Sequence, residues 1–297
     1  RTYFIMAHLK YWIEAARLKT LPASISPVLI ASALAYHENG FQLMVFIYCL
    51  AFAVLSQIGS NYANDYLDNK KGADTKERSG PRRLVSSGLL SEKAMRAACI
   101  LVLASAFLIG LNLIQYGGSG LLIVGISSLF FAWCYTGGPY PLAYNALGDV
   151  FVVLFFGLIA VCATFYVHTL TLNPLIILNA LACGLFTNSL LVINNIRDFE
   201  EDTKSDKRTT IVLFGERFGK KLIALSCLFA CVTALINALA TYSLLPILGI
   251  IPPCICLGQI KNISTQQSKE TMSRLLKNTG LNVFLYGILV SLGFFLS

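Results

Sequence analysis

Residues 97–136 read AACILVLASAFLIGLNLIQYGGSGLLIVGISSLFFAWCYT and carry no charged side chain. One helix needs about 20 apolar residues to cross a hydrocarbon core ~30 Å thick, so this stretch is long enough for two transmembrane helices. The whole chain has the same character, since 56% of its 297 residues are hydrophobic and only 13% are charged. Soluble domains carry about 25% charged residues. The composition therefore excludes an ordinary soluble domain and predicts a membrane protein.

Nine stretches of the sequence are apolar enough to be transmembrane helices. They are residues 20–36, 41–60, 95–114, 119–136, 147–167, 174–195, 221–240, 242–258 and 280–297. We expect an all-α fold, a bundle of nine transmembrane helices in a single membrane-embedded domain that covers residues 1–297. Residues 1–5 precede Met6 and are interpreted as a tag remnant or a truncated start.

The charges predict how this bundle is oriented. The chain has 23 Lys and Arg against 15 Asp and Glu. Every basic residue lies before the first predicted span, in the loops after the second, sixth and eighth, or within the first two residues of the span that follows such a loop. Basic loops stay in the cytoplasm. We therefore expect the N-terminus to lie in the cytoplasm. We also expect the helices to contact membrane lipid and the protein to be located in the cytoplasmic (inner) membrane. A nucleic-acid-binding protein would gather its basic residues in one surface patch, so no nucleic acid partner is expected.

Nine of the 15 acidic residues lie in two short stretches, residues 65–77 and 198–206, and each stretch continues a predicted span into a cytoplasmic loop. The first segment, residues 61–74, reads NYANDYLDNKKGAD. If this segment is helical, Asn64 and Asp68 lie four positions apart and share one face of the helix. Charge so close to hydrocarbon is costly, which indicates that it has a ligand to bind.

The second segment, residues 194–206, reads NNIRDFEEDTKSD. If it is helical, Asp198, Asp202 and Asp206 form a ladder along one face. Like charges stacked in this way repel one another, so a bound cation is expected to compensate them. The alternative is that both acidic segments are simply polar cytoplasmic loops.

Carboxylate and amide oxygens suit hard cations, and Mg²⁺ completes its coordination shell with substrate phosphates. The two segments therefore predict a site for Mg²⁺ and a diphosphate. The candidate metal ligands are Asn64, Asp68, Asp74, Asp198, Asp202 and Asp206. Basic side chains between the acids suit the remaining phosphate charge.

Two further motifs accompany the acidic segments, ARLKTLP at residues 16–22 and YTGGPYPLAYNALGD at 135–149. The first acidic segment contributes NDYLDNKKGAD at 64–74, and the second extends to NNIRDFEEDTKSDKRT at 194–209. With these motifs the chain resembles the UbiA superfamily of membrane prenyltransferases. Within it, the chain is most similar to the 1,4-dihydroxy-2-naphthoate polyprenyltransferases of menaquinone biosynthesis.

The resemblance implies nine transmembrane helices and a Mg²⁺-dependent site that faces the cytoplasm. It also implies transfer of a polyprenyl chain from polyprenyl diphosphate to 1,4-dihydroxy-2-naphthoate, with decarboxylation, to give demethylmenaquinone. The expected catalytic residues are Asp65, Asp68, Asp198 and Asp202. The expected substrate-binding residues are Lys19, Lys70, Arg78, Arg82, Tyr135, Asp149, Asn195, Lys204, Lys207 and Arg208. The aromatic candidates for stabilising an allylic cation are Tyr62, Tyr66, Tyr135 and Tyr140.

Asp149 is the only charged residue between positions 97 and 196, which makes it a functional candidate. The alternative is that it caps the N-terminus of the fifth span. His168 falls in a predicted loop on the opposite side and is assigned no function.

Two other functions remain open. The same reaction could use another aromatic acceptor, 4-hydroxybenzoate or homogentisate. A secondary transporter could also have this number of spans, but its acids would lie near the middle of the membrane rather than at helix ends.

Overall fold

The computed structural model describes residues 2–70 and 82–297, with side chains described from residue 9 onward. Every regular element in these residues is a helix, as expected. The elements are α1 (Thr2–Ala16), η1 (Leu18–Thr20), α2 (Pro22–His37), α3 (Leu43–Lys70), α4 (Glu92–Leu111), α5 (Ile114–Gly117), α6 (Gly120–Cys134), η2 (Leu142–Tyr144), α7 (Gly148–Val152), η3 (Val153–Ile159), α8 (Ala160–Thr169), α9 (Pro174–Arg197), α10 (Phe199–Lys204), α11 (Thr210–Ala240), η4 (Leu245–Ile250), α12 (Ile251–Gln259), η5 (Ile260–Asn262) and α13 (Lys269–Phe295). Here η3 is a π-helical turn and the other η elements are 3₁₀ turns.

Seven helical segments among the described residues are long and apolar enough to cross a membrane, and a bent pair at Leu9–Thr20 and Pro22–His37 brings the number to eight. The helix α6 is apolar but shorter, with 15 residues. The count of nine spans therefore stays a prediction. Large apolar side chains such as Leu101, Ile123 and Leu239 are exposed on the outer faces. Such exposure is expected where the surrounding solvent is lipid.

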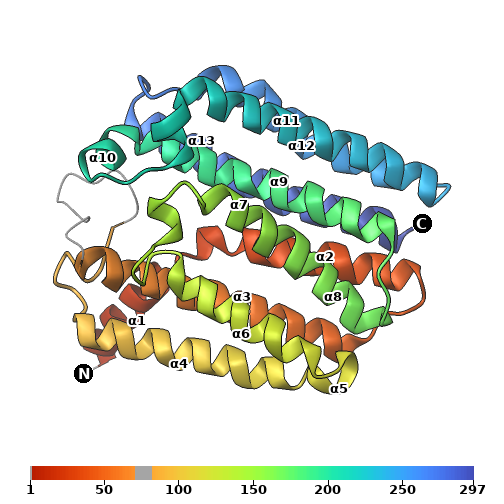
Figure 1. Cartoon of the computed structure of the whole chain (residues 1–297), viewed down its shortest axis with the longest axis horizontal. Coiled ribbons are helices and arrows are strands. Elements are labelled where there is room, and N and C mark those ends of the chain that lie inside the picture. The colour runs from red at the N-terminus through yellow and green to blue at the C-terminus, as the bar shows by residue number, and fades with distance from the viewer. Residues whose placement is uncertain (1, 71–81) are drawn as a thin grey trace.

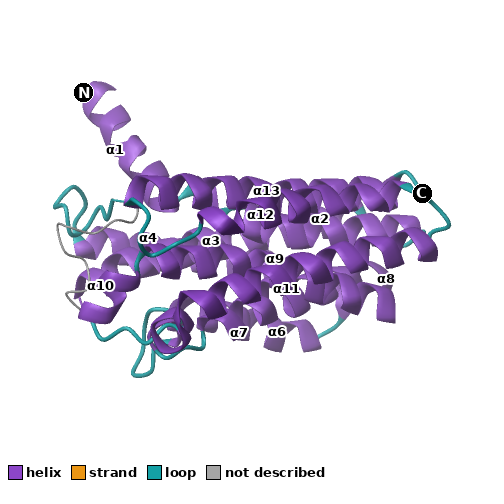
Figure 2. Cartoon of the chain, turned by 90° about the horizontal axis from the view of Figure 1, so that it is seen from above, coloured by secondary structure: helices purple, strands orange, loops and turns teal. Residues whose placement is uncertain are grey.

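The long helices lie side by side along one direction (Figure 1). The N-terminal helices α2, α3, α4, α6 and α8 form one half of the bundle, and α9, α11, α12 and α13 form the other. The halves are joined because α2 packs along α13 and α8 packs against α9. Seen from above, α1 and α10 lie at the same end of the bundle (Figure 2).

Three helices extend beyond their predicted spans, all at segments rich in charge. The helix α3 continues ten residues past position 60 to Lys70 and so carries the first acidic segment as a helix, as expected. The helices α11 and α13 begin 11 residues before the predicted spans. Each has a side-chain cap, since Thr209 Oγ1 accepts from Val212 N (3.2 Å) and Ser268 Oγ accepts from Thr271 N (3.2 Å).

The span Gly148–Thr169 contains the π-helical turn η3. Gly157 in this turn meets Gly184 of α9, and a Cβ atom on Gly157 would lie 2.5 Å from the carbonyl oxygen of Ala180. Small residues let two membrane helices approach this closely. Such π-helical turns occur often at functional sites, and this one turns Phe155 into the cavity described below.

The expectation that His168 lies in a loop is wrong. It belongs to the last turn of α8 and is buried. Its Nδ1 accepts from the backbone N–H of Gln42 (3.1 Å), so Nε2 carries the proton and donates to Ser32 Oγ (3.0 Å). His168 thus ties α2, α3 and α8 together at the end of the bundle away from the acidic segments.

Candidate active site

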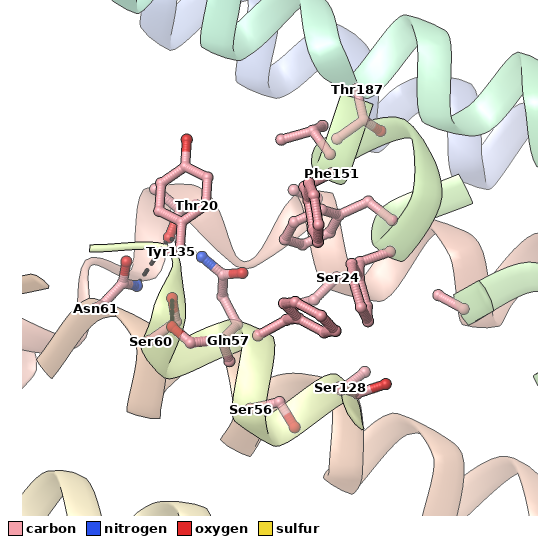
Figure 3. Close-up of a pocket in the computed structure, with 18 of the residues that line it drawn as sticks. Thr20, Ser24, Ser56, Gln57, Ser60, Asn61, Ser128, Tyr135, Phe151 and Thr187 are labelled. Carbon is pink, nitrogen blue, oxygen red and sulfur yellow. Dashed lines mark hydrogen bonds between the residues drawn. The ribbon is translucent and has the colours of Figure 1, made fainter. Parts of the chain in front are cut away.

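A cavity of about 1010 Å³ lies between α2, α3, α6, α8 and α9. Its polar end is lined by Asn64 and Asp68 of α3 and by Asn194 of α9. Deeper in, the lining is apolar and includes Phe107 and Val167. Figure 3 shows the middle of this cavity, where polar side chains on one wall face aromatic rings on the other. The shape and lining fit a ligand with a polar head and a long apolar tail.

The first acidic segment presents Asn64 and Asp68 to the cavity, as their spacing predicts. The Thr136 hydroxyl donates a hydrogen bond to Asn64 Oδ1. Asp68 forms a buried ion pair with Arg83 and accepts a hydrogen bond from the Tyr144 hydroxyl (3.1 Å). These partners fix both side chains at the polar end of the cavity.

Asp65 has a different environment from Asp68. It is fully buried, and its two carboxylate oxygens accept the backbone N–H groups of Leu84 (3.1 Å) and Val85 (3.0 Å). A carboxylate held in this way anchors the segment after residue 81 to α3. The geometry therefore places Arg83, the neighbour of Leu84, beside Asp68.

The second acidic segment begins in the last turn of α9, which ends at Arg197. Asp198 accepts from Arg197 Nε (2.6 Å) and Nη2 (2.8 Å), and also from Asn194 Nδ2 (3.2 Å). Asp202 pairs with Lys207 (3.1 Å). Asp198 occupies the N-cap position of α10 and Asp202 lies in its first turn. The helix dipole favours negative charge at this end of a helix. Their partners Asn194, Arg197 and Lys207 line the cavity, so the two carboxylates stand directly behind it.

The expected ladder of three aspartates is broken after Asp202. The helix α10 ends at Lys204, and Asp206 is exposed with a left-handed backbone (φ 53°). This turn lets the Lys207 backbone N–H bond to Asp202 O (2.9 Å) and brings the Lys207 ammonium back to the Asp202 carboxylate. Asp198 is itself a turn residue between α9 and α10, but the Asp202 backbone N–H donates to Asp198 O (2.8 Å), so the predicted four-residue spacing holds for this pair and is wrong for Asp206.

The two acidic segments meet through the loop that contains Tyr144. The Tyr144 hydroxyl donates a hydrogen bond to Asp68. Lys207, the partner of Asp202, lies 5.8 Å from the centre of the Tyr144 ring. The backbone joins them as well, since Arg208 N donates to Tyr144 O (3.1 Å) and Ala146 N donates to Arg208 O (2.7 Å). One site thus contains residues from both segments.

Asp149 lies inside α7 rather than at its N-cap position, which Leu147 occupies. Its carboxylate accepts from Asn188 Nδ2 (2.8 Å) and from the Thr210 hydroxyl (2.7 Å). The N-cap alternative is therefore wrong. Asp149 lines the cavity and at the same time joins α7 to α9 and α11.

Of the four candidate tyrosines, Tyr135 lines the cavity. It follows α6, and burial raises the pKa of its phenol, with further increases from the charges of Asp149, Asp68 and Asp202. The Tyr62 hydroxyl donates to Trp12 O (3.2 Å), the Tyr66 oxygen accepts from Trp133 Nε1 (2.9 Å), and Tyr140 is 60% exposed.

Sequence reasoning missed a cluster of phenylalanines on the cavity wall. The rings of Phe131, Phe151 and Phe155 lie 5.0 to 5.8 Å apart and all line the cavity. Phe151 and Phe155 stand four positions apart across the start of η3, a spacing that could have identified them.

The basic candidates divide by position. Lys19, Arg82 and Lys207 line the cavity, as does the buried amide Asn195. Lys70, Lys204 and Arg208 are exposed. Arg78 and the metal candidate Asp74 lie outside the described residues. Arg83 and Arg197, which were not among the candidates, are buried in ion pairs with the acids and line the cavity.

The sequence profile of the UbiA prenyltransferase family matches residues 24–288. The chain belongs to this family. It is 36% identical over 297 residues to the 1,4-dihydroxy-2-naphthoate octaprenyltransferase of Haemophilus influenzae, with 96% of each chain covered. It is 34% identical over 293 residues to the Escherichia coli protein of the same name, covering 96% of this chain and 95% of that one.

Solved structures confirm the UbiA fold. A UbiA homolog from Archaeoglobus fulgidus bound to GPP and Mg²⁺ superposes with a TM-score of 0.66 at 15% identity, over 94% of this chain and 99% of that one. Digeranylgeranylglyceryl phosphate synthase superposes with a TM-score of 0.62 at 16% identity, over 98% of this chain and 100% of the other. Its membership of the UbiA prenyltransferase family, together with its long apolar helices, makes the protein an integral membrane protein and a prenyltransferase.

The donor set of this UbiA site fits Mg²⁺. Asn64, Asp68, Asp198 and Asp202 supply only oxygen ligands, as the ion prefers. Among the described residues no three acidic, His or Cys side chains converge on one point. Each of the three carboxylates instead has a basic partner. Since the negative charges of these acids are balanced by the positive charges of their basic partners, a divalent ion fits best together with an anion. A diphosphate is such an anion, and it would bind the basic side chains.

Proposed function

We propose that this UbiA protein transfers a polyprenyl chain from polyprenyl diphosphate to 1,4-dihydroxy-2-naphthoate in a Mg²⁺-dependent reaction. The product is a prenylated 1,4-naphthoquinol, the reduced form of demethylmenaquinone, together with CO₂ and diphosphate. The observation that carries the proposal is the junction of both acidic segments at the polar end of an otherwise apolar cavity. The names of the relatives from H. influenzae and E. coli support the acceptor.

We place the reaction at the cytoplasmic side of the inner membrane. The acidic segments and the basic loops share one end of the chain's long helices, and basic loops stay in the cytoplasm. In this orientation the diphosphate enters from the aqueous side, and its chain extends among the apolar residues of the cavity. Acids at one end of the bundle also favour an enzyme over a secondary transporter.

In this proposal the metal ligands are Asn64, Asp68, Asp198 and Asp202, with Asp74 as a further ligand and exposed Asp206 contributing less. When bound, Mg²⁺ supplies positive charge that neutralises the departing diphosphate. Arg83, Arg197 and Lys207 exchange their carboxylate partners for phosphate oxygens. Charge-assisted hydrogen bonds of this kind are about twice as strong as neutral ones. They stabilise the leaving group more than the intact donor.

The bond between C1 of the donor and its diphosphate oxygen breaks to leave an allylic cation. Phe131, Phe151 and Phe155 exclude water from the space beside the polar end and present aromatic rings to this cation. The electron-rich ring of the acceptor attacks C1 of the donor through the ring carbon that carries the carboxylate. Loss of CO₂ from that ring carbon then restores the aromaticity of the ring. Asp65 acts in this scheme by positioning, because it holds the backbone next to Arg83.

The direct test incubates the purified protein with a polyprenyl diphosphate, Mg²⁺ and a panel of acceptors that includes 1,4-dihydroxy-2-naphthoate, 4-hydroxybenzoate and homogentisate. We expect prenylation of the naphthoate with release of CO₂, and no turnover in EDTA. Preferred use of another acceptor would correct the substrate, whereas full activity in EDTA would refute the metal's role.

A further inference from the structure

The helix α3 presents two amide side chains to the cavity on the deeper side of Asn64 and Asp68. Gln57 and Asn61 stand one helical turn apart, and both line the cavity together with Asn64 and Asp68. The rise of 1.5 Å per residue puts Gln57 about 10 Å deeper than Asn64 along the helix. A ring held at these amides would therefore lie next to the first carbons of a chain whose diphosphate is bound at Asp68.

Both amides are oriented by one hydroxyl. Thr20 Oγ1 accepts from Asn61 Nδ2 (3.0 Å) and from Gln57 Nε2 (3.2 Å). The Thr20 proton is already donated to the carbonyl oxygen of Arg17 (2.9 Å). Since Thr20 can only accept here, both amide NH₂ groups must face it. Figure 3 shows Gln57 and Asn61 gathered around Thr20 on one wall, with Phe151 on the other.

This orientation fixes where the two carbonyl oxygens point. Asn61 Nδ2 also donates to Ala16 O (2.9 Å), so its NH₂ group is fully used. The amide oxygens of Gln57 and Asn61 must then turn away from Thr20, and in the described part of the chain no side chain or backbone N–H donates to either. A cavity wall with two fixed acceptors attracts a ligand with O–H donors and repels a carboxylate.

We propose that Gln57 and Asn61 hold the hydroxyl groups of the aromatic acceptor and that Thr20 is the positioning residue for both amides. The inference rests on the proposed function and adds how the ring is oriented. The hydroxylated edge of the ring faces α3, and the carboxylate points away from these amides. The Phe131, Phe151 and Phe155 wall opposite is left for the isoprenoid chain.

The first experiment measures binding of 1,4-dihydroxy-2-naphthoate to the purified protein by calorimetry, without donor. Gln57→Met removes the accepting oxygen at similar size, and Thr20→Val removes the hydroxyl that orients both amides. Each is expected to raise the Kd roughly tenfold, the effect of one hydrogen bond. Thr20→Ser, which keeps the hydroxyl, is expected to bind as the wild type does. Ser128→Ala is the matched control, because that cavity hydroxyl donates a hydrogen bond within its own helix to Val124 O (2.7 Å).

The second experiment changes the ligand and therefore needs only the wild-type protein. The dimethyl ether of the acceptor, which lacks O–H donors, is expected to bind roughly tenfold more weakly. Gln57→Met should show no preference between the two ligands. In turnover, the variants should raise the KM for the acceptor and leave the KM for the donor unchanged.

Equal binding of acceptor and ether by the wild type would overturn the inference, as would an unchanged acceptor Kd in Gln57→Met. A rise only in the donor KM would assign these amides to the isoprenoid chain instead. Failure of the proposed function gives a different result, since a wild-type protein that prenylates no hydroxylated acceptor refutes that function whatever the binding data show.

Discussion

The hydroxyl of Tyr144 donates a hydrogen bond to Oδ1 of Asp68, 3.1 Å away. Tyr144 belongs to neither acidic segment, yet its ring also lies beside Lys207, the partner of Asp202. It therefore connects residues that are more than 130 positions apart in the sequence. The position of Asp68 relative to Asp202 depends on this contact.

Removal of the Tyr144 hydroxyl tests that connection. Tyr144→Phe keeps the ring beside Lys207 but leaves Asp68 with one donor fewer. A hydrogen bond to a charged group contributes about 1.5–3 kcal/mol to stability, so we expect the melting temperature to fall. Because Asp68 is then held less firmly, we also expect kcat/KM for the donor to fall by roughly tenfold or more. An unchanged kcat/KM would show that the contact has no part in positioning Asp68.

The neighbours Arg82 and Arg83 form a matched pair. Arg83 is buried in an ion pair with Asp68, whereas Arg82 is exposed at the cavity. Loss of one partner of a buried ion pair costs about 3–5 kcal/mol. Arg83→Gln is therefore expected to lower both the melting temperature and kcat, and Arg82→Gln to leave the melting temperature unchanged. Equal effects of the two variants on stability would contradict the burial of Arg83.

The second pair compares Asp202 with Asp206. We expect Asp202→Asn to reduce kcat by orders of magnitude and Asp206→Ala to reduce it by a few-fold at most, because Asp206 lies exposed beyond α10. The rates are measured at saturating Mg²⁺ and again during a Mg²⁺ titration. A decrease in kcat in Asp206→Ala as large as that in Asp202→Asn would show that Asp206 acts together with Asp198 and Asp202, as the three-residue ladder predicts.

Asp149 is expected to be needed for stability as well as for the cavity. In Asp149→Asn the new NH₂ group faces the donors of Asn188 and Thr210, so a buried hydrogen bond is lost. We expect a decrease of about 1–3 kcal/mol in the free energy of unfolding. Thr210→Val should cost a similar amount, and the double variant less than the sum of both. Strict additivity would show that the two residues do not interact.

The pH dependence tests the environment of Tyr135. Burial and three nearby carboxylates raise the pKa of its phenol above the ordinary value of 10. The phenol therefore stays neutral up to about pH 10, the ordinary tyrosine value. The pH–rate profiles of the wild type and of Tyr135→Phe should have the same alkaline limb below that pH. An alkaline loss of activity that disappears in Tyr135→Phe would contradict the raised pKa.

The sequence was sufficient to predict what depends on local pattern. Apolar runs located the helices, and the four-residue spacing of Asn64 and Asp68 put both on one face of α3, which the structure confirms. The same rule explains Asp65, since the residue next to Asn64 points about 100° away from it on a helix.

Partners across the fold could not be predicted in this way. Arg83 and Arg197 look like ordinary cytoplasmic charges in the sequence, and only packing shows that they are buried beside Asp68 and Asp198. The end of the second ladder depends on a left-handed residue at Asp206, which no spacing rule indicates. The meeting of the two segments at Tyr144 is likewise a property of the tertiary fold.

The central claim is that both acidic segments bind one diphosphate through Mg²⁺. Calorimetry with a non-reactive polyprenyl thiodiphosphate, with and without Mg²⁺, tests it in the wild type, Asp68→Asn, Asp202→Asn and the double variant. We predict that each single variant loses most of the Mg²⁺-dependent affinity and that the double variant binds little worse than either. Additive losses, or full Mg²⁺-dependent binding by Asp202→Asn, would show that the two segments do not share one ligand.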